Sequence, residues 1–136
     1  MYFEAYKKAN LATETPAQTE YRLFAEITRE LENANKEDAN SKDRVNALFR
    51  NSQLWLTLKI DLMSDDNKLN TETKAGLISL AIWVEKFSAA AFRTKQDLMP
   101  LISVNKDIMQ GLSNAAKTAR SQSTAESPGD FSQLSI

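Results

Sequence analysis

Four long stretches of the chain carry apolar residues at three- and four-residue spacing, and each follows a residue that can cap a helix. The first follows Thr15-Pro16-Ala17-Gln18, which has the hydroxyl, proline and glutamine of a capping box. Ser41 and Asn70 (or the threonine after it) are candidate caps for the next two, and Asp97 opens the fourth, with Pro100 just inside it. With only 3 glycines and 3 prolines in 136 residues, turns are few. The pattern predicts an all-α fold, a small bundle of about four helices.

The second and third stretches indicate how the helices pack. The second, about 41–63, has its apolar positions at Val45, Leu48, Phe49, Ser52, Trp55, Leu56, Ile60 and Met63. The third, about 71–94, is apolar on nearly all sides between Ala75 and Val84. A helix of that kind is usually the most buried one. We therefore expect the third helix at the centre of the bundle.

The two ends of the chain differ from this helical part. The N-terminal segment carries three aromatic residues close together, Tyr2, Phe3 and Tyr6. From Ala119 onward, serine, glutamine, proline and glycine dominate. Such a segment buries too little apolar surface to offset the entropy lost on ordering. We therefore predict a helical domain at residues 1–118, which begins with the aromatic segment, and a disordered Ser-rich tail at 119–136.

The residue types missing from the chain limit its chemistry. Cysteine and histidine are both absent, which excludes disulfides and thiolate metal sites and removes the commonest general base. The three glycines are scattered, so no glycine-rich phosphate loop exists. Catalysis by serine, lysine or paired carboxylates stays conceivable, but no such constellation stands out. We expect a binding protein that is not an enzyme, with no catalytic residues, cofactor or metal.

Charge and hydropathy indicate where the protein works. Its 17 Lys and Arg and 18 Asp and Glu mix along the chain, without the basic stripe that binds phosphates. Direct nucleic-acid binding is therefore disfavoured. The N-terminus lacks the apolar region of a signal peptide, and the most apolar run, Ala75 to Val84, is shorter than the roughly 20 residues that span a bilayer. We expect a soluble, cytoplasmic protein without membrane insertion.

Aromatic and large aliphatic side chains are the candidates for binding a partner. Trp55 and Trp83 lie on apolar helical stripes, where core packing is the favoured interpretation and anchoring of a partner helix is the alternative. Tyr2 and Tyr6 share a face if their segment is helical, and with Phe3 they either cap the core or form partner surface. A similar choice, between core and a groove for a partner helix, applies to Tyr21, Phe24 and Ile27.

Five segments follow one another in an order found in a known family. They are Met1-Tyr2 with Tyr6, the segment from Thr19 to Leu31, Asn51-Ser52-Gln53-Leu54-Trp55 followed by Asp61-Leu62, the segment from Leu77 to Val84, and the segment from Leu101 to Leu112. In this order and spacing the chain resembles the FlaF family of alphaproteobacterial flagellar proteins. The resemblance covers nearly everything from Met1 to Leu112 and does not explain the tail after about Ser113.

The resemblance implies a flagellin export chaperone that promotes flagellin synthesis and secretion, works opposite the regulator FlbT and is linked to the flagellar export gate. It implies no catalytic residues. The terminal regions of flagellin are amphipathic and polymerise by burying apolar helical faces, so a chaperone must cover those faces reversibly. A small bundle can do this by helix-in-groove binding, and we expect Tyr21, Phe24 and Ile27, with Trp55 or Trp83, to contribute.

Two other functions compete with this interpretation. One is post-transcriptional regulation of flagellin expression, acting on the mRNA directly or through another protein such as FlbT. It predicts an affinity for RNA that falls steeply with salt. The other, from a different class, is an enzyme with an unrecognised carboxylate site, which the residue composition supports little.

Overall fold

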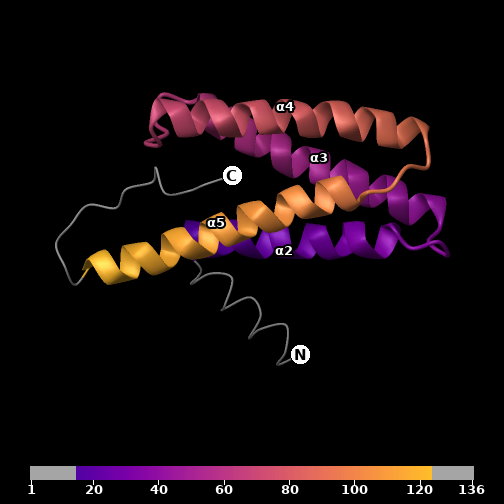
Figure 1. Cartoon of the computed structure of the whole chain (residues 1–136), viewed down its shortest axis with the longest axis horizontal. Coiled ribbons are helices and arrows are strands. Elements are labelled where there is room, and N and C mark those ends of the chain that lie inside the picture. Colours follow the sequence, from indigo (N-terminus) through magenta and orange to yellow (C-terminus); the bar gives the residue numbers. More distant parts are fainter. Residues whose placement is uncertain (1–14, 124–136) are drawn as a thin grey trace, which may run out of the picture.

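The structure is a computed structural model that describes residues 15–123, and their side chains as far as Asn114. Four helices occupy this part of the chain: α2 (Pro16–Ala34), α3 (Ser41–Met63), α4 (Thr71–Arg93) and α5 (Met99–Ser123). No strand occurs between residues 15 and 123, which confirms the predicted all-α bundle (Figure 1). The aromatic segment with Tyr2, Phe3 and Tyr6, and residues 124–136 of the predicted tail, lie outside the described residues.

Side-chain caps start the first three helices. Thr15 Oγ1 accepts a hydrogen bond from the Gln18 amide at 3.1 Å, and Gln18 Oε1 accepts one from the Thr15 amide at 2.9 Å, which is the predicted capping box. Asn40 and Asn70 cap α3 and α4, each through a 2.8 Å bond from the amide three residues further on. Ser41, a predicted cap, is instead the first helical residue of α3, because the Asn40 side chain already satisfies that amide.

Helix α5 starts against the end of α2. Asn35 donates its Nδ2 hydrogen to Asp97 Oδ1 and accepts one from the Leu98 amide, both at 2.8 Å. Asp97 Oδ1 also accepts from the Met99 amide at 2.9 Å. The hydrogen bond from the Asn35 side chain, and to a lesser extent the one from the Met99 amide, holds the pKa of Asp97 below its ordinary value. The residues after α2 and before α5 thereby tie the first and last helices together.

The far end of α5 corrects one prediction. The helix continues to Ser123, five residues past the boundary expected at residue 118. Alanine, lysine, arginine and glutamine between residues 115 and 122 are all good helix formers. Helix α5 therefore extends past the predicted boundary, and the division into a helical domain and a disordered tail stays a prediction.

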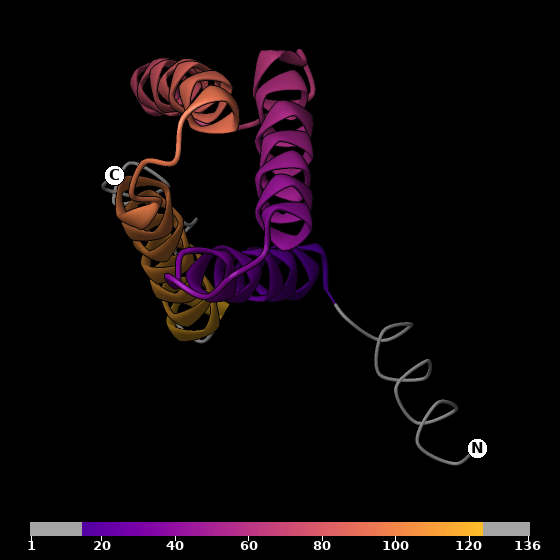
Figure 2. The same cartoon turned by 90° about the vertical axis from the view of Figure 1, so that its right-hand side faces the viewer.

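Helices α2 and α3 form the inside of the bundle. Helix α2 packs against both α3 and α5, whereas α4 packs closely only against α3. Figure 2 shows α4 and most of α3 in the upper part of the view, and α2 and most of α5 in the lower part. The expectation that α4 occupies the centre is wrong. Its buried face is made largely of small side chains, among them Ala81, Ser88 and Ala91, which let α3 approach closely, and its larger side chains are left on the outside.

A polar network lies in the middle of the core. The Phe24 ring packs edge-on against Trp55, with centroids 5.8 Å apart and planes at 88°. The Trp55 indole Nε1 donates to Asn105 Oδ1 at 2.9 Å, and Asn105 Nδ2 donates to Asn51 Oδ1 at 2.8 Å. All four side chains are buried, so the network joins α3 to α5 at the centre of the molecule.

Candidate partner-binding surface

Helix α3 carries an apolar stripe that none of its neighbours covers. Five large side chains on it are exposed to solvent, and with the half-buried Ser52 they follow three- and four-residue steps on one side of the helix. We call these five residues the α3 stripe: Val45, Phe49, Leu56, Ile60 and Met63. Ile60 is 61% exposed and Met63 67%, the highest values among the large apolar side chains described. The stripe runs almost the whole length of α3.

Helix α4 borders this stripe. Lys59 of α3 forms an ion pair with Glu85 of α4, and Val45 and Phe92 line one hollow between the two helices. Ile82 and Phe92 lie three and seven residues from Glu85 and so share its side of α4. Both are exposed, at 40% and 45%. We call the α3 stripe together with Ile82 and Phe92 of the neighbouring helix the outer face.

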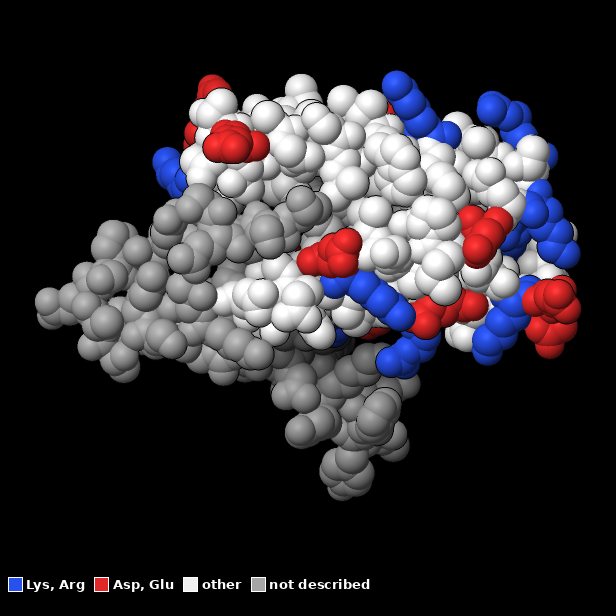
Figure 3. All heavy atoms as spheres, in the orientation of Figure 1, with Lys and Arg blue, Asp and Glu red and all other residues white. Residues whose placement is uncertain are grey.

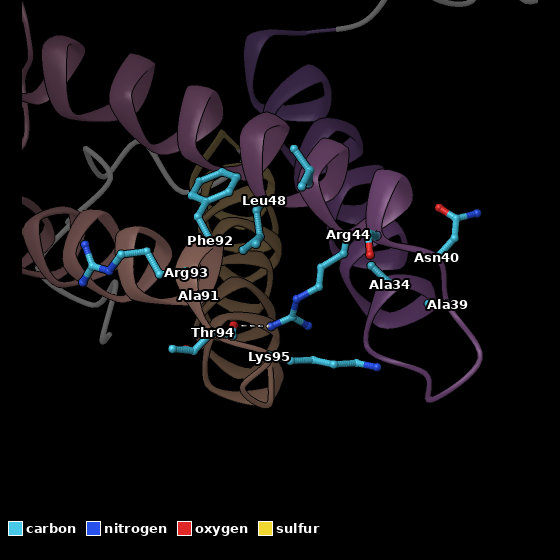
Figure 4. Close-up of a pocket in the computed structure, with 12 residues that line it drawn as sticks. Ala34, Ala39, Asn40, Arg44, Leu48, Ala91, Phe92, Arg93, Thr94 and Lys95 are labelled. Carbon is cyan, nitrogen blue, oxygen red and sulfur yellow. Dashed lines mark hydrogen bonds between the residues drawn. The ribbon is translucent and has the colours of Figure 1, made fainter.

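The hollow lies at the Val45 end of the outer face (Figure 4). Its apolar wall contains Leu48, Ala91 and Phe92, and Arg44 crosses its floor. Arg44 Nη2 donates to the Gln96 carbonyl at 2.6 Å and lies 3.4 Å from that of Thr94, so the guanidinium holds the α4–α5 connection. The hollow thus combines this apolar wall with a polar rim that includes Asn40, Arg93 and Lys95.

The opposite end of the α3 stripe is acidic. Asp61 lies within the last turn of α3, and Asp65 and Asp66 follow in the turn after it. Glu20 is exposed to solvent, but partial desolvation, and then the charge of Asp61, raises the pKa of its carboxyl above the ordinary value. The described part of the chain provides none of Asp61, Asp65 or Asp66 with an ion-pair partner. This end of the stripe therefore favours a basic ligand.

The structure separates the side chains proposed from sequence into two groups. Phe24, Ile27 and Trp55 are buried in the core, at 4% exposure or less, which agrees with the packing interpretation favoured for Trp55. Tyr21 is 41% exposed and Trp83 is 37% exposed, so the core packing favoured for Trp83 is wrong. No single groove brings these five together, because three of them fill the inside of the bundle. Their role in binding a partner stays a prediction.

Trp83 lies on a second apolar side of α4. Its ring packs against Phe87, with centroids 5.2 Å apart. Having apolar residues on several sides, α4 is long and apolar enough by length and composition to cross a membrane, with a mean hydropathy of 1.4 and only 28% of that window buried. The Ala75–Val84 run alone underestimates how long the apolar part of α4 is. One of its faces, with Leu77 and Val84, is nonetheless buried in the bundle against α3.

Charges on the described surface are mixed in sign. On the face shown in Figure 3, uncharged side chains cover most of α4, an acidic and a basic side chain lie near the centre, and further charged side chains of both signs lie toward the right-hand side. Between residues 15 and 114, Arg22, Arg50, Lys59 and Lys106 each pair with a glutamate. The described residues contain no group of three acidic side chains placed to hold a metal ion. The arrangement of the described residues thus offers apolar contact as its main chemistry.

Sequence reasoning missed the exposure of the α3 stripe. Two sets of positions on α3 have helical spacing: the exposed stripe, and the buried set Leu48, Asn51, Trp55 and Leu62. Each set includes a polar residue, Ser52 on the line of the stripe and Asn51 in the buried set, so apolar character alone does not tell them apart. The usable signal was that α3 has more apolar positions than one core-facing side of a helix can bury.

Comparison with known proteins identifies the family. The model of the family described as flagellar protein FlaF matches residues 2–112, which is most of the chain and includes α2, α3 and α4 entirely. No curated protein and no solved structure matches the chain. The match ends within α5, before the serine-rich tail.

Proposed function

Because the chain belongs to the FlaF family of flagellar proteins, we propose that it binds flagellin in the cytoplasm as an export chaperone and so promotes flagellin synthesis and secretion. The observation that carries this proposal is the outer face: five large apolar side chains of α3, with Ile82 and Phe92 of α4, exposed at helical spacing. On a monomer, contiguous apolar surface of this kind marks a site for another protein. The activity is binding, and no catalytic step is involved.

The shape of the outer face suits an amphipathic helix. A partner helix lying along α3 would place residues at i, i+7 and i+11 against Phe49, Leu56 and Ile60, the spacing of one apolar helical face. The hollow between Val45 and Phe92 would take one larger side chain at the end of that helix. Flagellin's amphipathic terminal regions have this chemistry, and their cover by the chaperone would prevent polymerisation before export.

The rival function, regulation of flagellin expression through RNA, finds little support in the described surface. The cations there alternate with carboxylates, and four of them are paired within the bundle. FlbT and the flagellar export gate remain further protein partners within our proposal. We also assign α4 to the bundle and not to a bilayer, because its Leu77–Val84 face is buried against α3.

The test is co-purification of the full chain with the flagellin of its own organism, using paired variants of α3. Phe49→Ser/Leu56→Ser removes two stripe side chains, and Gln53→Ser/Thr57→Ser changes two exposed polar positions of the same helix that border the stripe but are not part of it. Full burial of a large apolar side chain contributes about 1.5–3 kcal/mol, so the stripe variant should bind about 100-fold more weakly or worse. The control should bind like the natural chain.

Either of two results would reject the proposal. One is an unaltered flagellin affinity in a stripe variant whose circular dichroism is that of a folded bundle. The other is no flagellin complex at all, together with an RNA affinity that falls steeply with salt, which would establish the regulator instead.

A further inference from the structure

We propose that two copies of the chain pair through the α3 stripe, with their α3 helices antiparallel and related by a two-fold axis. This goes beyond flagellin binding, because the occupant of the stripe is a second copy of the same chain. Three observations support it: the open side of α3, the spacing of the stripe, and the opposite charges at its two ends.

Helix α3 has one side that faces away from the rest of the bundle. Its other sides pack against α2 and α4. Figure 2 shows α4 to the left of α3 and α2 below it, and leaves the upper right of α3 without a neighbouring described helix. The stripe residues are 40% to 67% exposed, so they belong to this uncovered side. Apolar surface of this kind is a site for another protein surface.

The spacing of the stripe is nearly the same in both directions along α3. Val45 and Met63 each lie nine residues from Leu54. Phe49 and Ile60 lie five and six residues from it. When two identical helices pack antiparallel about a two-fold axis, each residue meets the one at the same distance on the other side of the centre. Val45 of one copy then meets Met63 of the other, and Phe49 meets Ile60.

The centre of this arrangement pairs a small side chain with a large one. Ser52 and Leu56 each lie two residues from Leu54, so the serine of one copy meets the leucine of the other, twice. Small side chains opposite large ones let two helices interdigitate and approach closely. The stripe is therefore complementary to itself in the antiparallel register.

The Val45 end of the stripe is basic. Lys42 is exposed and lies three residues before Val45, so it continues the same side of α3. Asp43 is two residues from Val45 and therefore faces another side of the helix. Arg93 and Lys95 line the hollow at this end, and no carboxylate lines it. Within the described part of the chain, none of these three cations has an ion-pair partner.

The Met63 end of the stripe is acidic. Asp65 and Asp66 follow directly in the turn after α3, are exposed, and have no ion-pair partner among the described residues. In the antiparallel dimer, Lys42 of one copy lies beside these two carboxylates of the other, at both ends. A parallel pair would bring like charges together, so the charges favour the antiparallel arrangement.

A consequence for flagellin binding rests on the proposed function. A second copy and a flagellin helix would occupy the same stripe, so dimerisation and flagellin binding exclude each other. The apparent affinity for flagellin should then fall as the concentration of the free chain rises, by mass action.

Sedimentation of the full chain without flagellin tests the dimer independently of the proposed function. The sedimentation coefficient should rise with concentration from that of a monomer to that of a dimer. Met63→Ser should weaken the dimer about 100-fold, because the change removes a large apolar contact at both ends. Met99→Ser, the same change at a residue that is 52% exposed on α5, should leave the dimer unchanged. Circular dichroism checks that both variants are folded.

A charge exchange tests the register. Lys42→Asp should weaken the dimer several-fold at low salt, because carboxylates then face each other at both ends. Lys42→Asp/Asp65→Lys/Asp66→Lys should restore it. Within one chain, Lys42 and Met63 are 21 residues or about 32 Å apart along α3, so this rescue reports contact between copies.

Three results would overturn the proposal. The first is a chain that stays monomeric at the highest concentration that dissolves. The second is a dimer that survives Met63→Ser in a folded protein. The third is a dimer that Lys42→Asp leaves unchanged, or that the exchanged charges do not restore.

Discussion

Replacement of Asn105 by leucine tests whether the buried polar network holds α5 against α3. Asn105 has no exposed surface, accepts from the Trp55 indole at 2.9 Å and donates to Asn51 Oδ1 at 2.8 Å. Leucine has a similar volume, so the main effect is the loss of both hydrogen bonds. The Trp55 N–H and the Asn51 carbonyl oxygen would each stay buried without a partner.

The expected magnitude follows from those two groups. A buried polar group left without a hydrogen bond costs about 1–3 kcal/mol, so Asn105→Leu should lower the free energy of unfolding by about 2–6 kcal/mol. The Asn51 Nδ2 group already has no partner, so loss of the bond from Asn105 leaves the whole Asn51 side-chain amide without a hydrogen bond. Total stability of a domain is about 5–15 kcal/mol, which makes this a large fraction.

Urea unfolding, followed by tryptophan fluorescence and circular dichroism together, measures the change. With a slope of about 1–3 kcal/mol per molar urea, the midpoint should fall by about 1 M or more. Asn46→Leu, at an exposed position of the same helix pair, should stay within about 0.5 kcal/mol of the natural chain.

A combined variant provides the decisive comparison. Asn51→Leu/Trp55→Phe/Asn105→Leu removes all the partners together and should recover much of the lost stability, because no polar group of this network is then left unpaired. The reasoning would be refuted if Asn105→Leu matched Asn46→Leu, or if the triple variant were less stable than Asn105→Leu alone.

Three further outcomes are expected. Phe49→Ser on the outer face should change stability by no more than about 0.5 kcal/mol, whereas Leu48→Ser, one residue away in the core, should cost several kcal/mol in the same urea assay. Thr15→Ala, which breaks the capping box of α2, should cost about 0.5–2 kcal/mol, and Thr15→Ser should restore it. The folded-state pKa of Glu20 is raised above its ordinary value of 4.5, so folding is favoured while this carboxyl is protonated and stability falls as pH rises through the folded pKa. Glu20→Gln should therefore stabilise the protein at pH 7 and have little effect below pH 4 in thermal unfolding; equal effects at both pH values would contradict the assigned cause.

The sequence predicted the helices better than their arrangement. Caps and apolar spacing are local properties, and they located four helices and the Thr15–Gln18 capping box. Placement of α4 depended on which of its sides a neighbour would cover. Because α4 is apolar nearly all round, its sequence does not distinguish a helix at the centre from one packed through a face of small residues.

The buried amides and the exposed stripe were missed for related reasons. Asparagine is mostly an exposed residue, so Asn51 and Asn105 gave no sign of being fully buried until the Trp55 indole was seen to bond to one of them. Periodicity shows that Val45, Phe49 and Leu56 share a side of α3. It does not show whether that side meets the core or the solvent, which the tertiary packing decides.

Calorimetry of the full chain with its flagellin, over a range of temperatures and at low and high salt, tests the central claim most directly. Burial of the outer face against an amphipathic helix predicts a complex with negative ΔCp whose affinity changes little with salt and is lost in Phe49→Ser/Leu56→Ser. A complex that dissociates steeply with salt, or one unaffected by that variant, would contradict the account.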